Sequence, residues 1–333
     1  MSNYHSRKEK KKLYKKTAFL FLGIFIIGGI LGVLLHAADQ SKLQAPEEST
    51  EEEADLVTIG GENYRPKTSL NTYLFIGVDS SETRPDQVCG GQADTIELLV
   101  QDRANDIYYR ISIHRNTMAT VESFDDDGNS VGKSNLQISY AYAQGDAGEK
   151  SCENLMQSVS ELLYNYPIDH YVSVTMDAIS TINHQLGGVK VTVNDDFSKV
   201  DKTLIKGQTI TLNDEQAYHF IHERKNVGDG TNENRMNRQN EYLQAAKTNF
   251  TAKMKADTSF ALDFYDALEP YICTDLSRKK FAKMAEEMVV EKDGGRYQLE
   301  GSSEVGRFNE EEYTLDQEQL DDLVTKILFE RAE

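Results

Sequence analysis

Residues 72–78 read TYLFIGV, an apolar run that ends directly before Asp79. A run of this length, rich in aromatic and β-branched side chains, predicts a strand buried on both faces. Two further strands are predicted at residues 96–100 and 107–113, and alternation of apolar and polar residues in the second indicates one buried face. The folded part of the chain is therefore expected to begin near Ser69 with strands.

Helical patterns alternate with strands in the rest of the chain. Asn213 and Gln216 have the spacing of a capping box, and Gly187-Gly188 is expected to stop a helix. Helices are predicted at residues 151–164, 177–186, 213–223, 238–255, 277–289 and 316–329, and another strand at residues 189–193. Strands interleaved with helices indicate a layered α/β domain rather than a helical bundle or a β-sandwich.

The first 38 residues have a different character. Residues 1–16 carry seven Lys and Arg residues against one acidic residue, and no Asp, Glu, Lys or Arg occurs from Thr17 to Ala38. A bilayer core needs about 20 apolar residues in a helix, so residues 17–38 are expected to span a membrane. A cleaved signal peptide is the alternative, but its apolar core is usually only about 7 to 15 residues long.

The charge distribution predicts the orientation of this span. A Lys and Arg cluster directly before a span places residues 1–16 in the cytoplasm, so the chain after Ala38 is expected to be extracellular. The whole chain has 36 basic and 55 acidic residues, a formal charge of −19. Such a surface argues against nucleic-acid binding, because phosphate binding there requires dense Lys and Arg.

Residues 39–68 are acidic and poor in apolar side chains, and they are expected to form an extended tether that precedes a domain at residues 69–333. Cys89, Cys152 and Cys273 allow three single disulfide bridges, and the sequence leaves open whether a Cys89–Cys152 bridge forms.

Several common hydrolase and metalloprotease motifs are missing from the sequence: it has no Walker loop, no H-E-x-x-H and no C-x-x-C. Two carboxylates remain of interest, because Asp79 follows one predicted strand and Asp94 precedes the next. Carboxylates at neighbouring strand ends can converge on Mg²⁺, which prefers oxygen ligands. The alternative is that each residue only caps a turn.

Several basic and amide side chains also lie at the ends of predicted elements: Arg115, Arg224, Arg235, Arg238 and Gln239. Guanidinium groups beside a helix N-terminus make a phosphate site, because they combine bidentate donors with the positive end of the helix dipole. The alternative is a solvated helix face that pairs with surrounding acidic residues.

Six blocks, in this order and spacing, resemble the LytR-CpsA-Psr family. They are YLFIGVDSS (73–81), QADTIELLVQD (92–102), ISIHRNT (111–117), DHYVSVTMDAISTINHQLGGVKVTV (169–193), LNDEQAYHFIHERK (212–225) and NENRMNRQNEYLQA (232–245). The resemblance covers about residues 69–290. It implies a three-layer α/β/α domain with a central mixed sheet, preceded by one transmembrane helix.

The resemblance also implies an activity. Family members transfer a glycopolymer phosphate, of teichoic-acid or capsular type, from a polyprenyl-pyrophosphate carrier to peptidoglycan. Matched by motif, Asp79 and Asp94 would hold Mg²⁺ or Mn²⁺, and Arg115 would act with them in catalysis. The residues that would grip the pyrophosphate are Arg115, His222, Arg224, Arg235, Arg238 and Gln239.

Four positions depart from the usual family pattern. Residues 112–116 read Ser-Ile-His-Arg-Asn, where the family usually has Ser-Ile-Pro-Arg-Asp. His222 replaces the first arginine of an R-x-R pair, and Asn232 replaces an acidic residue. A histidine is charged only when it is protonated, near neutral pH and below. Two alternatives to the transferase therefore stay open: a weakened prenyl-phosphate or glycan-binding scaffold or regulator of the envelope, and a polyprenyl pyrophosphatase.

Overall fold

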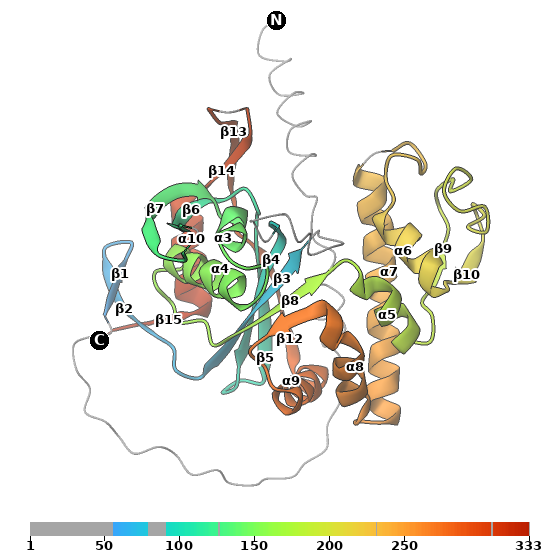
Figure 1. Cartoon of the computed structure of the whole chain (residues 1–333). Helices are drawn as coiled ribbons and strands as arrows, with labels where there is room; N and C mark the ends of the chain where they lie inside the picture. The colour runs from blue at the N-terminus through green and yellow to red at the C-terminus, as the bar shows by residue number, and fades with distance from the viewer. Residues whose placement is uncertain (1–55, 79–90, 126, 231, 308, 333) are drawn as a thin grey trace, which may run out of the picture.

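A six-stranded mixed sheet forms the centre of the computed structural model, which describes residues 56–78, 91–125, 127–230, 232–307 and 309–332 (Figure 1). Its strands lie in the order β11-β8-β3-β4-β5-β12. Their bounds are β11 Ile272–Thr274, β8 His170–Thr175, β3 Leu70–Val78, β4 Ala93–Asp102, β5 Ile107–Ile113 and β12 Lys292–Gln298. The β3, β4 and β5 strands confirm the three predicted from the apolar runs.

Strand β3 lies in the middle of this sheet. It pairs antiparallel with β4 and parallel with β8. Side chains on both faces are buried: Leu74 and Phe75 of β3 are 0% and 1% exposed, and Leu98 and Leu99 of β4 are 0% and 1% exposed. Burial on both faces follows from the unbroken apolar run, since alternation with polar residues would have left one face open to water.

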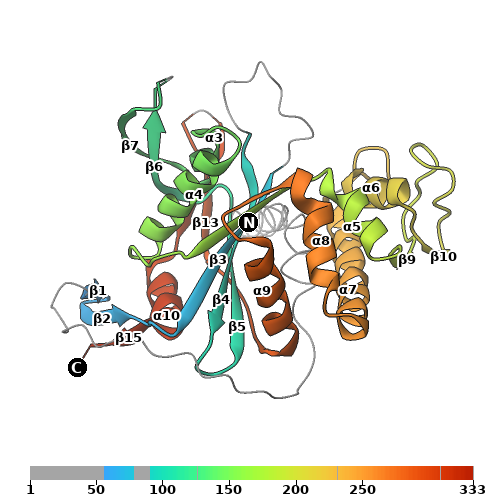
Figure 2. The same ribbon diagram turned by 60° about the horizontal axis from the view of Figure 1, so that its bottom comes forward.

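Helices cover both faces of the sheet (Figure 2). One face carries α3 (Ser139–Ala143) and α4 (Glu149–Leu162), which contact β4 and β8 respectively. The other carries α8 (Phe260–Leu268), the short 3₁₀ helix Glu269–Tyr271 and α9 (Arg278–Val290). Gln101 of β4 donates to Glu287 and Glu291 at the end of α9, at 3.0 and 2.5 Å. The layered α/β prediction is therefore confirmed.

The chain leaves β8 to form a group of helices at one side of the sheet (Figure 1). These are α5 (Ala178–Gln185), α6 (Asp214–His222) and α7 (Asn232–Ala256), together with the strand pair β9 (Lys190–Thr192) and β10 (Thr209–Thr211). The capping box that begins α6 is confirmed: Asn213 Oδ1 accepts from the Gln216 backbone at 2.8 Å, and Gln216 Oε1 accepts from the Asn213 backbone at 3.0 Å. Helix α7 begins six residues before the predicted start at Arg238.

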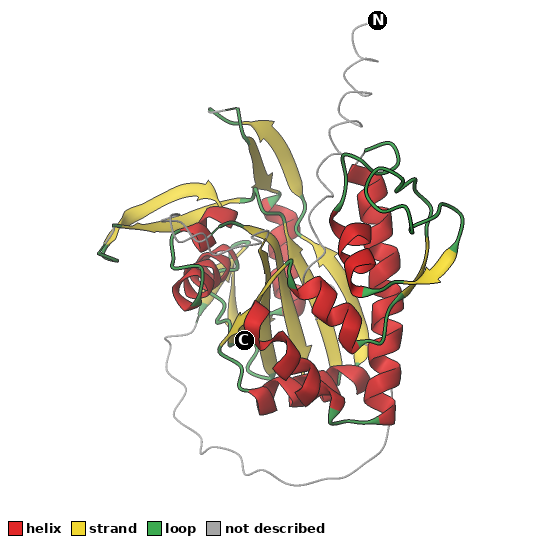
Figure 3. Cartoon of the chain, turned by 45° about the vertical axis from the view of Figure 1, so that its right-hand side comes forward, coloured by secondary structure: helices red, strands yellow, loops and turns green. Residues whose placement is uncertain are grey.

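Two hairpins that were not predicted project beyond the central sheet, away from the group formed by α5, α6 and α7 (Figure 3). The first is formed by β6 (Met118–Phe124) and β7 (Ser130–Gln137), and the second by β13 (Gly301–Val305) and β14 (Glu311–Leu315). A parallel bridge between Thr117, directly before β6, and Tyr313 of β14 helps to connect them. Their strands contain many polar and exposed residues, so no apolar run in the sequence predicts them.

Strand structure begins before Ser69, where the domain boundary was predicted. Strands β1 (Val57–Ile59) and β2 (Glu62–Pro66) form a small sheet with β15 (Phe329–Arg331), which follows α10 (Gln317–Ile327). Ile59 is only 2% exposed. The tether expected at residues 39–68 is therefore wrong for its last part, because strand pairing with the chain end compensates for the low apolar content there.

The remaining N-terminal predictions lie outside the described residues: the basic tail at residues 1–16, the span at residues 17–38 and the first part of the tether. Within the described ranges, no helix is both long and apolar enough to cross a bilayer. Cys89 also lies outside them. Cys152 of α4 and Cys273 of β11 are free thiols that hydrogen-bond to each other, and this contact raises the pKa of Cys152 and lowers that of Cys273.

Candidate active site

Asp94 and Arg115 come together at the end of the central sheet. Strands β3 and β5 end here and β4 begins, with Val78 paired to Ala93. The Arg115 guanidinium forms an ion pair with the Asp94 carboxylate through Nη1 and donates to the Gln92 side chain through Nη2. The side chains of Arg115 and Asp94 are 23% and 14% exposed. Two of the predicted site residues therefore contact each other, and this ion pair remains partly open to solvent.

The chain after β5 holds Arg115 in a tight turn. The Thr117 backbone donates to the His114 carbonyl at 2.9 Å, and the Ser139 backbone donates to the Arg115 carbonyl at 3.1 Å. Arg115 Nε is buried and has no hydrogen-bond partner among the described residues. A buried donor without an acceptor is costly, so this atom suits an oxygen of a bound anion.

The turn between α6 and α7 carries a second set of predicted residues. Arg224 is partly buried there, and its side chain forms no ion pair or hydrogen bond with any described residue. His222 ends α6, stacks on Tyr218 with ring centroids 4.9 Å apart, and has Nδ1 3.7 Å from the Glu223 carboxylate. Arg235 is partly buried in the first turn of α7. Strand β8 ends beside Val78, and the chain continues from it through α5, β9, β10 and α6 to this turn (Figure 1).

Arg238 is placed differently from the sequence expectation of an open, ligand-gripping side chain. It is 2% exposed, and its Nη1 bonds to the Asp195 carboxylate at 2.6 Å. Nε donates to the Phe220 carbonyl at 2.9 Å, Nη2 donates to the Glu223 carbonyl, and the guanidinium lies 5.2 Å from the Phe197 ring centroid. Burial lowers the pKa of Arg238, and the Asp195 carboxylate offsets part of this effect.

Gln239 has a related role, since its Nε2 donates to the Ile221 carbonyl at 3.1 Å. The last carbonyls of a helix have no partner within the helix. Arg238 and Gln239 therefore cap the C-terminus of α6 from α7, and they hold in place the segment that carries His222 and Arg224. The spacing along α7 correctly predicted that Arg238 and Gln239 act at the same place. It could not predict the partner of Arg238, Asp195, which is distant in the sequence.

The metal prediction involves Asp79 and Asp94. Asp79 follows the last residue of β3 in the sequence but lies outside the described residues. Among the residues that are described, no group of three or more His, Cys, Asp or Glu side chains is arranged to hold a metal ion. Asp94 supplies a carboxylate at this sheet end, a donor type that fits Mg²⁺ when phosphate and water complete the shell.

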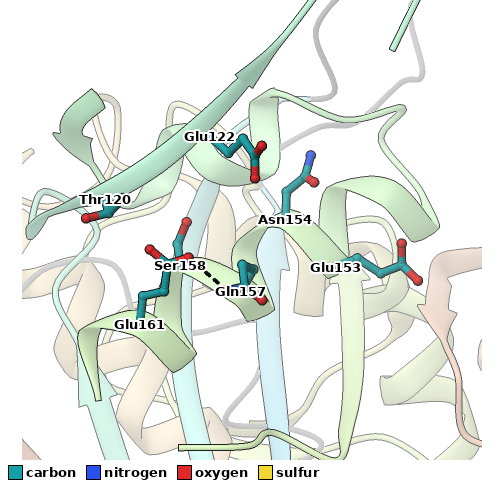
Figure 4. A pocket seen from close by; sticks show the side chains of 7 residues that line it. All are labelled: Thr120, Glu122, Glu153, Asn154, Gln157, Ser158 and Glu161. Carbon is teal, nitrogen blue, oxygen red and sulfur yellow. Dashed lines mark hydrogen bonds between the residues drawn. The ribbon is translucent and has the colours of Figure 1, made fainter. Parts of the chain in front are cut away.

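A cavity of about 230 Å³ lies between β6 and α4, and none of the predicted residues lines it (Figure 4). Glu122, Glu153 and Glu161 contribute carboxylates to its wall, and Gln157 donates to Glu161 at 2.8 Å. Negative walls repel a diphosphate, so this cavity is a poor candidate for such a ligand. A second groove, of about 450 Å³, lies at the start of α6 and includes His219.

Several curated proteins align with most of this chain at about a quarter identity. "Polyisoprenyl-teichoic acid--peptidoglycan teichoic acid transferase TagU" of Bacillus subtilis (strain 168) is 26% identical over 276 residues, which cover 82% of this chain and 81% of TagU. The TagU of Bacillus licheniformis is 25% identical over 274 residues, 81% of this chain and 80% of that protein. For TagV of Bacillus subtilis the identity is 26% over 226 residues, 65% of this chain but only about half, 52%, of TagV.

Solved structures share the fold. Protein gbs0355 from Streptococcus agalactiae superposes with a TM-score of 0.58 at 20% identity, covering 80% of this chain and 90% of that one. Bacillus subtilis TagV gives 0.55 at 21% identity, with 78% and 97% covered. The structure described as TagT bound to LI-WTA gives 0.53 at 19% identity, with 78% and 90% covered.

The profile of the LytR_cpsA_psr family matches residues 34–327, which includes every described strand from β1 to β14. The match extends well beyond the six blocks that carried the resemblance. This chain belongs to the LytR-CpsA-Psr family.

Proposed function

We propose that this protein transfers a glycopolymer phosphate from a polyprenyl-pyrophosphate carrier to a hydroxyl group of peptidoglycan. Relatives named as teichoic acid transferases support transfer of a glycopolymer at the level of the family. The observation that carries the proposal is the Asp94–Arg115 pair at the open end of the sheet, where Arg115 Nε lacks a partner among the described residues.

In the proposed reaction, the oxygen of the acceptor hydroxyl bonds to the phosphorus next to the glycan while the bond from this phosphorus to the bridging oxygen breaks. Polyprenyl phosphate leaves, and the hydroxyl proton passes to the leaving phosphate or to water. Negative charge on the phosphate oxygens must be stabilised during this step. Arg115 and Arg224 would supply the positive charge that stabilises it, and Arg235 and His222 would add to this from the α6–α7 turn. Arg238 and Gln239 would contribute by fixing this turn rather than by touching the diphosphate.

We also propose Mg²⁺, with Mn²⁺ as a substitute, as the cofactor, bound by Asp94 and Asp79 together with the diphosphate. A bound divalent cation would neutralise phosphate charge that the arginines leave uncompensated. Support comes from the donor chemistry of Asp94 and from the position of Asp79 in the sequence, directly after β3.

The test uses the full-length protein in detergent with a polyprenyl-diphosphate-linked disaccharide and a peptidoglycan fragment. Release of polyprenyl phosphate that depends on the acceptor, and is lost in Arg115→Ala, would support transfer. Release without the acceptor would instead indicate a pyrophosphatase. Binding of the carrier without any release would indicate a scaffold or regulator, which the amide at Asn116 and the histidine at His222 favour as the second candidate.

The proposed location is the cell membrane, with residues 1–16 in the cytoplasm and the α/β domain outside. Its support is the basic cluster before the uncharged stretch at residues 17–38. Protease added to cells whose wall has been removed should degrade the domain and leave residues 1–16 protected. A domain that resists protease in intact cells and is degraded only after lysis would contradict this topology.

A further inference from the structure

Two of the positions that depart from the family pattern contact the same element, hairpin β13–β14. Asn116 Nδ2 donates to the Glu311 carboxylate at 3.2 Å. The His114 ring lies 4.7 Å from the Tyr313 ring, and His114 is only 7% exposed. The family residues at these positions, proline and aspartate, would lack the ring contact and would place a second carboxylate against Glu311.

The backbone also connects this hairpin to the turn that holds Arg115. Tyr313 N donates to the Asn116 carbonyl at 2.9 Å, and Thr117 forms a parallel bridge with Tyr313. Figure 1 shows β14 beside the start of β6, which continues from this turn. His114 and Asn116, the neighbours of Arg115 in the sequence, therefore both contact strand β14.

Glu311 is itself held from several directions. Its second carboxylate oxygen accepts from Ser303 Oγ at 2.7 Å, and its backbone carbonyl accepts from Gln137 Nε2 of β7 at 2.6 Å. An ionised carboxylate only accepts hydrogen bonds, so an amide donor at position 116 suits it and an ionised aspartate does not. Like charges at this distance repel each other strongly when they are partly buried.

We infer that hairpin β13–β14 positions Arg115 for the diphosphate, and that Asn116 and His114 are adaptations to this hairpin. The inference rests on the proposed function for its ligand. It assigns Glu311 and Tyr313 as positioning residues, which act through the 114–116 turn and do not themselves touch the reacting atoms. The asparagine at position 116 is then no sign of lost activity, because Glu311 supplies the carboxylate against which the turn is fixed.

The test is a charge-exchange cycle in the full-length protein: Asn116→Asp, Glu311→Gln and the double variant. Asn116→Asp places two carboxylates together, so the turn should loosen and the transfer rate should fall about ten- to a hundredfold, the scale on which displacement of a catalytic group by about 1 Å acts. In the double variant the new amide at position 311 can donate to the new carboxylate at position 116, so the rate should return to within about threefold of the wild type. Ile205→Ser, at a half-exposed position between β9 and β10 and outside this hairpin, is the control and should change nothing.

A second readout is independent of turnover. The Nε–H resonance of Arg115, recorded by NMR without substrate, should broaden or shift in Asn116→Asp and return in the double variant. The affinity for geranylgeranyl diphosphate should likewise fall in Asn116→Asp and recover in the double variant. A wild-type protein without transfer activity would defeat the proposed function but leave the resonance test valid. An Asn116→Asp variant with unchanged rate and resonance, or a double variant that stays as impaired as Asn116→Asp, would overturn the inference.

Discussion

Arg115 and Arg238 both stand in motifs that resemble the family's phosphate-binding blocks, yet the structure uses them in opposite ways. Arg115 is 23% exposed, pairs with a partly exposed carboxylate and keeps Nε without a described partner. Arg238 is 2% exposed, and its three nitrogen atoms are taken by Asp195 and by two backbone carbonyls. One guanidinium is available to a ligand and the other is part of the framework.

The difference shows that an arginine's position in a motif does not determine its physical role. A guanidinium whose donors are satisfied inside the protein gains little from a diphosphate, while one with an open donor gains a charged hydrogen bond. Replacing Arg238 should therefore mainly lower the stability of the fold, and replacing Arg115 should mainly weaken ligand binding.

Arg238→Ala should lower the free energy of unfolding by about 3 to 5 kcal/mol, because it leaves Asp195 buried without its partner and the end of α6 uncapped. Urea unfolding followed by circular dichroism measures this loss. Arg278→Ala is the matched control: Arg278 also pairs with one carboxylate, Asp266, but both side chains are about half exposed, so its unfolding midpoint should barely change. Equal midpoints for the two variants would contradict the assignment of Arg238 to the framework.

Arg115→Ala should weaken binding of a polyprenyl diphosphate about ten- to a hundredfold, since a hydrogen bond to a charged group contributes about 1.5 to 3 kcal/mol. The unfolding midpoint should change much less than in Arg238→Ala. Isothermal titration with geranylgeranyl diphosphate measures the affinity. Arg331→Ala, which removes a largely exposed ion pair with Glu62, serves as the control for loss of one positive charge. Unchanged binding in Arg115→Ala would place the diphosphate elsewhere.

Asp94→Asn tests the metal. At a Mg²⁺ concentration about ten times its dissociation constant, a folded state that binds the ion gains about 1.4 kcal/mol. Thermal unfolding of the wild type should therefore shift upward with Mg²⁺, and the shift should disappear in Asp94→Asn. Asp275→Asn is a suitable control, because that carboxylate pairs with His170 away from this sheet end. A shift that survives in Asp94→Asn would remove Asp94 from the metal site.

His222→Arg should have the smallest effect, a several-fold gain in diphosphate affinity. An arginine carries a permanent positive charge and offers a fork of donors that matches a phosphate, which an imidazole does not. Isothermal titration with geranylgeranyl diphosphate measures the difference, and equal affinities of the wild type and His222→Arg would place His222 outside the site.

Much of the fold could be predicted from sequence because its signals are local. The apolar run at residues 72–78 defined β3, and the capping residues Asn213 and Gln216 defined the start of α6. The two hairpins lacked such a signal, and β2 depends on pairing with the chain end, so these elements were missed. Asp94 and Arg115 were predicted as site residues because both lie at the ends of neighbouring predicted strands. The ion pair between them is seen only in the structure.

By itself, the sequence determined the family, the core strands and the residue types that could meet a diphosphate, since each depends on patterns within short segments. Tertiary structure alone decided which arginine stays open. Arg238 meets Asp195 across 43 residues of chain, and Asn116 meets Glu311 across 195. Contacts of this range depend on how the elements pack, because burial and the identity of the partner, rather than the side chain itself, decide whether a charge supports the framework or binds a ligand.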